Sequence, residues 1–164
     1  RADVCKTSSG ILLDPYYVLE YPDWVNITAM DDQERLLLVR QYRQGSGRIE
    51  YEIPGGVIDP HDATPLDAAR RELLEETGFH ADEIVPVGRL SPNPATHANT
   101  LHCFAARGLH HDPASLNPDE TEDIAWEFAS LTRVSEMIAD GRYRGALQVS
   151  GIFLSLKYWG LHLC

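Results

Sequence analysis

The first half of the chain alternates apolar and polar positions in the manner of β-strands. Stretches rich in Val, Ile, Leu and Tyr are the predicted strands of this half, over residues 11–20, 24–30, 34–43 and 48–53. The run Asp31-Asp32-Gln33 separates two of these strands and is a turn signal. The same pattern returns later and predicts strands over residues 83–90, 100–106 and 123–129. The chain is therefore predicted to be built largely on short strands.

Helical spacing of apolar residues replaces this alternation in three segments, 65–77, 131–140 and 146–163. In the last segment the predicted core-facing residues are Val149, Ile152, Phe153, Leu156 and Trp159. Polar residues interrupt this segment, and nowhere does an apolar run reach the length of about 18 residues that predicts a membrane span. We therefore expect no membrane partner. Strands mixed with three helices favour an α+β fold or an α/β/α sandwich.

The first predicted helix carries complete start and stop signals. Thr64 is a good N-cap, and Pro65 occupies the first helical position, where its missing N–H costs nothing. Asp67 follows Thr64 by three residues, as in a capping box, and Gly78 supplies a left-handed stop. These signals predict a helix of about 13 residues, roughly 20 Å long. Its inward face is predicted to hold Leu66, Ala69, Leu73 and Thr77.

Three glutamates of this helix, Glu72, Glu75 and Glu76, stand at i, i+3 and i+4 and share one face. Like charges at this spacing destabilise a helix by about 0.2–0.5 kcal/mol per pair, so stability alone does not favour them. Carboxylates that converge on one turn suit a hard divalent cation such as Mg²⁺ or Mn²⁺. Arg71 is positioned to brace Glu72 and Glu75. A plain solvated face is the alternative, but the turn, cap and stop signals in register favour a metal site.

Composition limits the kinds of partner that this protein can bind. The 164 residues fit one domain, or one domain with a small appendage. Lys and Arg number 14 against 25 Asp and Glu, a net charge of −11, which excludes nucleic-acid binding through a broad basic face. Phosphates would have to be bound by a few arginines, by backbone amides or by cations held on carboxylates. Cys5, Cys103 and Cys164 form neither a disulfide framework nor a zinc ribbon, so we expect a cytoplasmic protein.

The run from Arg71 to Phe79, RELLEETGF, resembles the second half of the Nudix box, Arg-Glu-apolar-x-Glu-Glu-x-Gly-apolar, at every fixed position. The runs LVRQYR at 38–43 and EIPGG at 52–56 resemble the ADP-ribose pyrophosphatase branch of the Nudix hydrolases. This resemblance implies the Nudix fold, an α/β/α sandwich with a mixed β-sheet and a short N-terminal β-strand extension. We expect the extension to cover residues 1–30 and the hydrolase domain residues 31–164.

The chain departs from the Nudix box at one place. Arg71 follows Gly56 one position later than the box requires, and no glutamate stands where the first box glutamate belongs. Ala63 holds that position in register, and Asp62 is the nearest carboxylate. We expect activity to survive this change with altered metal affinity, and a domain that binds a nucleotide without hydrolysing it is the alternative.

The resemblance also implies roles for individual residues. Glu72, Glu75, Glu76 and the carbonyl of Gly55 would be the metal ligands. Glu76 and Arg71 would belong to the catalytic set, with Arg71 holding the glutamates in place. Two further residues, Arg43 and Glu52, would bind the substrate. Arg43 would contact a substrate phosphate and Glu52 would line the same cavity; alternatively, Arg43 caps a strand end and the two pair with each other.

A base that activates water is implied in an acidic loop after the later strands. Residues 119–123 read DETED, and within them Glu122 is the expected base and Glu120 the second choice. A solvated acidic loop without a catalytic role is the alternative. Outside the box, Trp24 and Tyr42 could stack on a base, although a strand aromatic otherwise belongs to the core.

The implied activity is hydrolysis of a nucleoside diphosphate linked to another moiety, with Mg²⁺ or Mn²⁺ as cofactor. ADP-ribose is the first expected substrate. Other nucleotide sugars, dinucleotides or nucleoside triphosphates are the alternatives within the enzyme class, and a nucleotide sensor without turnover is the alternative outside it. The resemblance further implies a homodimer formed through the N-terminal strands.

Overall fold

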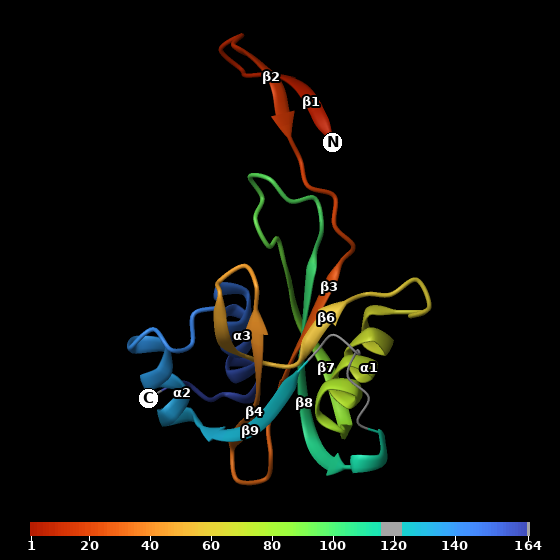
Figure 1. Cartoon of the computed structure of the whole chain (residues 1–164), viewed down its shortest axis with the longest axis vertical. Helices are drawn as coiled ribbons and strands as arrows, with labels where there is room; N and C mark the ends of the chain where they lie inside the picture. The colour runs from red at the N-terminus through yellow and green to blue at the C-terminus, as the bar shows by residue number, and fades with distance from the viewer. Residues whose placement is uncertain (116–122, 164) are drawn as a thin grey trace.

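In the computed structural model, which describes residues 1–115 and 123–163, the strands and helices are arranged in layers (Figure 1). The strands are β1 (Ala2–Lys6), β2 (Leu12–Tyr17), β3 (Trp24–Ala29), β4 (Arg35–Arg43), β5 (Arg48–Glu52), β6 (Gly55–Val57), β7 (Phe79–Leu90), β8 (Leu101–His111) and β9 (Ile124–Ser130). The helices are α1 (Pro65–Thr77), α2 (Leu131–Ala139) and α3 (Ala146–Trp159), with a 3₁₀ turn at Pro113–Ser115.

Two sheets form the centre of the molecule. One has the strand order β6-β3-β8-β7, in which β3 and β8 run parallel and the other pairs are antiparallel. The other has the order β5-β4-β9 and is antiparallel throughout. The parallel pair makes the first sheet mixed, as the sequence predicts. It also places the start of β3 beside the start of β8, with Trp24 in register with Leu101.

Two hydrophobic cores lie against the helices. Strand β4 contributes to both because successive side chains of a strand point to opposite faces: Leu37 packs with α1, whereas Leu36 and Leu38 pack with α2 and α3. Figure 1 shows α1 on one side of the sheets and α2 with α3 on the other. The fold is therefore α+β, with a mixed sheet between helices, and the predicted fold class is confirmed.

Helix α1 begins and ends at the predicted residues. The Thr64 hydroxyl oxygen accepts a hydrogen bond from the Asp67 N–H at 3.2 Å, and Gly78 adopts a left-handed φ of 70°. The prediction for α3 is wrong at one position, because Phe153 is 63% exposed. Ile152 and Leu156 hold the core face of this helix, and Phe153 points away from it.

The N-terminal hairpin of β1 and β2 extends away from the layered body (Figure 1). The segment that follows it is tied to the loop after β7, since the Leu19 N–H donates to the Thr96 carbonyl at 2.7 Å. The Tyr16 hydroxyl donates to the Ala95 carbonyl in the same loop. The boundary expected from the sequence, at residue 30, places β3 in the N-terminal extension. In the structure β3 pairs with β6 and β8 in the four-stranded sheet. Among the described residues, no helix is both long and apolar enough to cross a membrane.

Candidate active site

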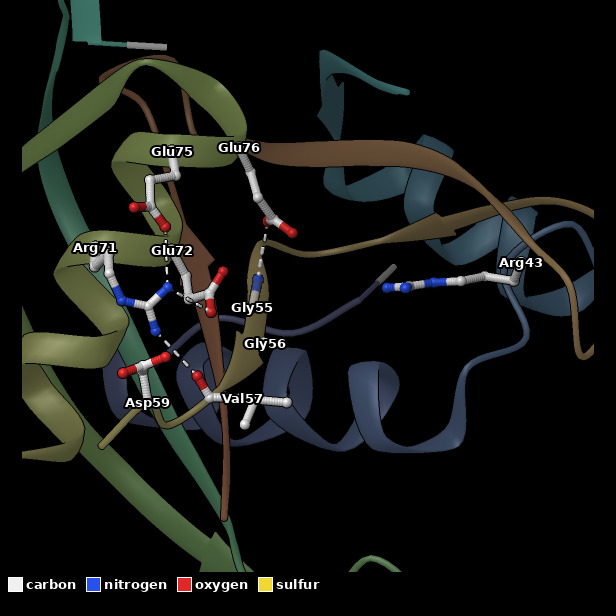
Figure 2. A pocket seen from close by; sticks show the side chains of 9 residues that line it. All are labelled: Arg43, Gly55, Gly56, Val57, Asp59, Arg71, Glu72, Glu75 and Glu76. Atoms are coloured by element: carbon white, nitrogen blue, oxygen red, sulfur yellow. Dashed lines mark hydrogen bonds and ion pairs between the residues drawn. The ribbon is translucent and has the colours of Figure 1, made fainter. Parts of the chain in front are cut away.

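A cavity of about 280 Å³ lies between α1 and β6 (Figure 2). Its lining residues are Arg43, Gly55, Gly56, Val57, Asp59, Arg71, Glu72, Glu75 and Glu76. The three glutamates come from consecutive turns of α1 and line the cavity together. Figure 2 shows Arg43 pointing toward Gly55 from the side opposite α1. The geometry thus collects four acidic side chains, the three glutamates and Asp59, and two arginines around one space.

The wall opposite the glutamates consists of two glycines, Gly55 and Gly56. A Cβ atom on Gly56 would lie 2.5 Å from Oε1 of Glu72, and a Cβ atom on Gly55 would lie 2.3 Å from the carbonyl oxygen of Val25. The Gly55 N–H donates to Oε2 of Glu76 at 3.0 Å, and Glu76 is only 4% exposed. Because the strand has no side chains here, the carboxylates approach its backbone closely.

Arg71 connects two of the glutamates of the cavity, Glu72 and Glu75. Its Nη1 donates to Glu72 at 3.0 Å and to Glu75 at 2.9 Å, and its Nη2 donates to the Val57 carbonyl at 3.0 Å. Hydrogen bonds to the surrounding carboxylates, those to Asp62 first, raise the pKa of Arg71 further above its usual value. Arg71 therefore holds the two glutamates and the β6 backbone in one arrangement.

Asp62 is a further hydrogen-bond partner of the Arg71 guanidinium. Its carboxylate accepts from Nε at 3.1 Å and from Nη2 at 2.9 Å, and its side chain is 7% exposed. The hydrogen bonds from Arg71 lower the pKa of Asp62 below its usual value. Ala63, which stands in register with the first box glutamate, is exposed. The longer loop thus brings Asp62 to Arg71. The loop also brings Asp59 to the cavity, a residue that the box pattern does not mark.

Arg43 and Glu52 form a two-point ion pair, with both nitrogen–oxygen distances at 2.7 Å. They pair across the antiparallel strands β4 and β5, and Gln148 of α3 lies 3.4 Å from Oε2 of Glu52. Arg43 nevertheless lines the acidic cavity, and both residues line a second cavity beside it. The ion pair between Arg43 and Glu52, which the sequence analysis gave as an alternative to substrate binding, is therefore present. Both residues nevertheless line a cavity of the site.

The second cavity has a volume of about 360 Å³ and shares Arg43, Gly55, Gly56 and Val57 with the first. Its other lining residues are Trp24, Val25, Asn26, Glu52, Leu101, Leu147 and Gln148. The contribution of α3 was missed by sequence reasoning, because nothing in the local pattern shows that the start of this helix meets β5 and β6. Tyr42 lines neither of the two cavities.

The acidic cavity suits a hard cation by its chemistry. In the part of the chain that the structure describes, no three His, Cys, Asp or Glu side chains are already grouped as a metal site. Glu72 and Glu75 accept hydrogen bonds from Arg71, and Glu76 accepts one from the Gly55 N–H. The donors are all oxygens on one helix face, and the glycine wall leaves room beside them, so the residues fit Mg²⁺ or Mn²⁺. Glu120 and Glu122 lie outside the described residues.

Comparison with known proteins finds one matching family model and several similar proteins. The model of the NUDIX domain matches residues 21–145. The ADP compounds hydrolase NudE of Escherichia coli K12 is 31% identical over 126 residues, which cover 77% of this chain and 66% of that protein. The ADP-ribose pyrophosphatase of Mycobacterium tuberculosis is 27% identical over 135 residues, covering 82% of this chain and 65% of that protein.

Solved structures show the same likeness. A crystal structure of an ADP compounds hydrolase superposes with a TM-score of 0.81 at 27% identity, covering 96% of this chain and 83% of that one. The matched part of the chain spans slightly less than two thirds of the length of the two curated relatives.

Proposed function

Because the chain belongs to the Nudix family, we propose that it hydrolyses the diphosphate of ADP-ribose or of a related nucleotide sugar. The relatives named for ADP compounds and ADP-ribose support this substrate class. The observation that carries the proposal is the carboxylate face of α1, held by Arg71 and set against the glycine wall of β6. In the reaction, water attacks one phosphorus and the bond to the bridging oxygen breaks, which gives two phosphorylated products.

Hydrolases of this family generally need divalent metal ions. Glu72, Glu75 and Glu76 would hold Mg²⁺ or Mn²⁺, with the Gly55 carbonyl as a further ligand. When bound, such ions neutralise the charge that the diphosphate carries. This would let a chain of net charge −11 bind a polyanion.

The other site residues position the substrate and the carboxylates. Arg43 would donate hydrogen bonds to a phosphate oxygen, as a planar guanidinium does well, while Glu52 keeps it aimed at the cavity. Arg71 would fix the orientation of Glu72 and Glu75 without contacting substrate. We assign the base that removes a proton from water to Glu122, with Glu120 as the second candidate, on the family resemblance alone.

The homodimer and the cytoplasmic location are part of the same proposal. Val4, Leu12 and Tyr17 of the N-terminal hairpin are 66%, 61% and 67% exposed. A two-stranded hairpin is marginally stable by itself in water, so a covering surface is expected, and we assign it to a second copy of the chain. Within the expected extension of residues 1–30, the hairpin of β1 and β2 would then supply the dimerisation surface, since β3 belongs to the central sheet. Two free thiols, Cys5 and Cys103, are compatible with a reducing compartment.

A substrate panel tests this function. ADP-ribose, other nucleotide sugars, dinucleotides and nucleoside triphosphates are incubated with the protein and Mg²⁺ or Mn²⁺, and phosphorylated products are separated and quantified. We expect ADP-ribose to give AMP and ribose 5-phosphate with the highest kcat/KM. No product from any compound, together with tight binding of one of them, would instead identify a nucleotide sensor.

A further inference from the structure

The start of helix α3 is fixed against the strands that carry the site. Nδ2 of Asn26 in β3 donates to the Leu147 carbonyl at 3.1 Å, which ties the first turn of the helix to the central sheet. The N-cap position holds Gly145, although Ser, Asp or Asn would cap the helix better. A Cβ atom on Gly145 would lie 2.8 Å from Cγ of Gln148. The glycine therefore leaves room for the Gln148 side chain beside the start of the helix.

Gln148 binds the end of β5 with both ends of its side-chain amide. Its Oε1 accepts from the Ile53 N–H at 3.1 Å, and its Nε2 donates to Oε2 of Glu52 at 3.4 Å. Because the Ile53 N–H can only donate, the amide oxygen faces it and the NH₂ group faces the carboxylate. A glutamate in place of Gln148 would repel Glu52, and an apolar side chain would remove the acceptor of the Ile53 N–H. Glutamine is therefore the residue type that satisfies both neighbours.

Glu52 in turn holds Arg43. Its two oxygens accept from Nε and Nη2 of Arg43 at 2.7 Å each, so the position of the carboxylate sets the plane of the guanidinium. The side chain of Glu52 is 13% exposed, whereas that of Arg43 is 41% exposed and points toward Gly55 in the acidic cavity (Figure 2). A long exposed side chain samples many conformations, but one held by a buried carboxylate is oriented before a ligand binds.

We propose that Gln148 is a positioning residue, which sets Glu52 and through it orients Arg43 toward the substrate diphosphate without contacting the substrate. The inference rests on the proposed function and deepens it, because it adds α3 to the elements that prepare the phosphate contact. Arg43 would meet the diphosphate in the bound substrate and in the transition state alike. Loss of its orientation should therefore appear mainly in KM.

A double-mutant cycle tests whether Gln148 acts through Glu52. Gln148→Met keeps the length of the side chain and removes both hydrogen bonds, so KM for ADP-ribose should rise about tenfold while kcat changes less than about twofold. In a Glu52→Ala background the same substitution should change KM less than about twofold, because the residue through which it acts is already absent. A tenfold effect in both backgrounds would overturn the proposal, since Gln148 would then act independently of Glu52.

Gln148→Glu is the second variant and covers a Glu52→Ala protein that fails to fold. It keeps the shape of the side chain and the acceptor for the Ile53 N–H, but it places a negative charge against Glu52, so KM should rise more than in Gln148→Met. Ser150→Ala is the matched control on α3, where it removes a hydrogen bond to the Ala146 carbonyl, and it should keep the wild-type KM. A wild-type KM in Gln148→Glu would overturn the proposal.

Binding of AMP separates this inference from the proposed function, because AMP has a phosphate and needs no turnover. Its dissociation constant, measured by calorimetry with Mg²⁺ present, should rise in Gln148→Met and stay at the wild-type value in Ser150→Ala. An unchanged dissociation constant in Gln148→Met would overturn the role of Gln148 and leave the hydrolase function standing. A wild-type protein that binds AMP in this way but does not hydrolyse ADP-ribose would contradict the function and support the role of Gln148.

Discussion

At the scale of single residues, the arrangement of the site depends on the hydrogen bonds that Arg43 and Arg71 make to carboxylates. Arg71 donates hydrogen bonds to four groups, three carboxylates and one carbonyl, and so holds the side chains of the acidic cavity in place. The spacing of Arg71 from Glu72 and Glu75 in the sequence predicted that it would bind these two carboxylates. The sequence did not predict that Asp62 also binds Arg71. The loop before α1 has one residue more than the Nudix box, and the box pattern does not show which carboxylate of such a loop reaches Arg71.

Asp62→Asn should therefore weaken the site without removing any proposed ligand. An amide cannot balance the charge of Arg71, so Glu72 and Glu75 would be held less firmly. Outer partners of metal ligands typically contribute about 10- to 100-fold in metal affinity or activity, and we expect a loss of this size in activity at low Mg²⁺. Asp140→Asn is the control, since Asp140 makes a comparable pair with Arg142 away from the site. Equal activity of the two variants over a metal titration would show that Asp62 has no such part.

Asp23 gives a prediction for the pH dependence of stability. Burial alone would raise the pKa of Asp23, but hydrogen bonds from His102 at 3.0 Å and from the Thr100 N–H at 2.8 Å outweigh it and lower the pKa below the ordinary 3.8. A lowered folded pKa stabilises the protein above the ordinary value, and this contribution is lost as the pH falls through the folded pKa.

Acid unfolding of Asp23→Asn measures this contribution. Above the ordinary pKa the variant should be less stable than the wild type, and the difference should shrink as the pH falls below it. Asp32→Asn, an exposed aspartate of the turn before β4, is the matched control and should follow the wild type. A constant difference between Asp23→Asn and wild type across the acid range would contradict the linkage.

At the scale of elements, the site is the meeting of α1 with β6. Helix α1 was predictable to the residue because Thr64, Pro65 and Gly78 are strong local signals. Strand β6 is only three residues long and was missed, since PGG at 54–56 indicates a turn by local chemistry. What makes it a strand is its pairing with β3, a contact between distant parts of the chain. Strand β1 was also missed. It pairs with β2 in the hairpin and packs on neither hydrophobic core of the described residues, so its sequence lacks the alternation of a half-buried strand.

Gly56→Ala tests the contact between these two elements. The new methyl would meet Oε1 of Glu72, the end of a flexible side chain, so the carboxylate should move while the backbone stays. We expect activity to fall about tenfold or more, with stability changed by less than about 1 kcal/mol. Gly45→Ala is the matched control, because nothing lies within 4 Å of its added Cβ. Full activity of Gly56→Ala would mean that the position of Glu72 at this wall does not matter.

At the scale of the whole molecule, the N-terminal hairpin is the feature that extends away from the layered body. Its apolar side chains are exposed, and the segment behind it carries Tyr21, which packs toward Trp24. From its alternation, the sequence indicated one strand of this hairpin, over residues 11–20, which corresponds to β2. An N-terminal strand extension was expected from the family resemblance and not from the pattern itself, because alternation shows that a strand has an apolar face and not which surface covers it.

The proposed dimer makes the hairpin sensitive to added charge. A Leu12→Glu/Tyr17→Glu variant should shift the protein from a dimer toward a monomer of 18.4 kDa, measured by sedimentation equilibrium. Tyr158→Glu places a charge at a residue that is also more than half exposed, on α3, and should remain dimeric. A wild-type protein that sediments as a monomer would refute the assignment of this surface.

The central claim is that the glutamates of α1 support metal-dependent hydrolysis of a nucleoside diphosphate. Glu76 is the most buried of the three and lies against the Gly55 amide, so replacing its charge should change the site and little else. The most direct measurement is the rate of AMP formation from ADP-ribose by Glu76→Gln and by wild type with saturating Mg²⁺ or Mn²⁺. Metal-free melting temperatures of the two proteins serve as the control for folding.

We predict that Glu76→Gln loses activity by at least about 100-fold while its metal-free melting temperature stays close to that of the wild type. The same rate of AMP formation in both proteins, under the same metal concentrations, would contradict the account.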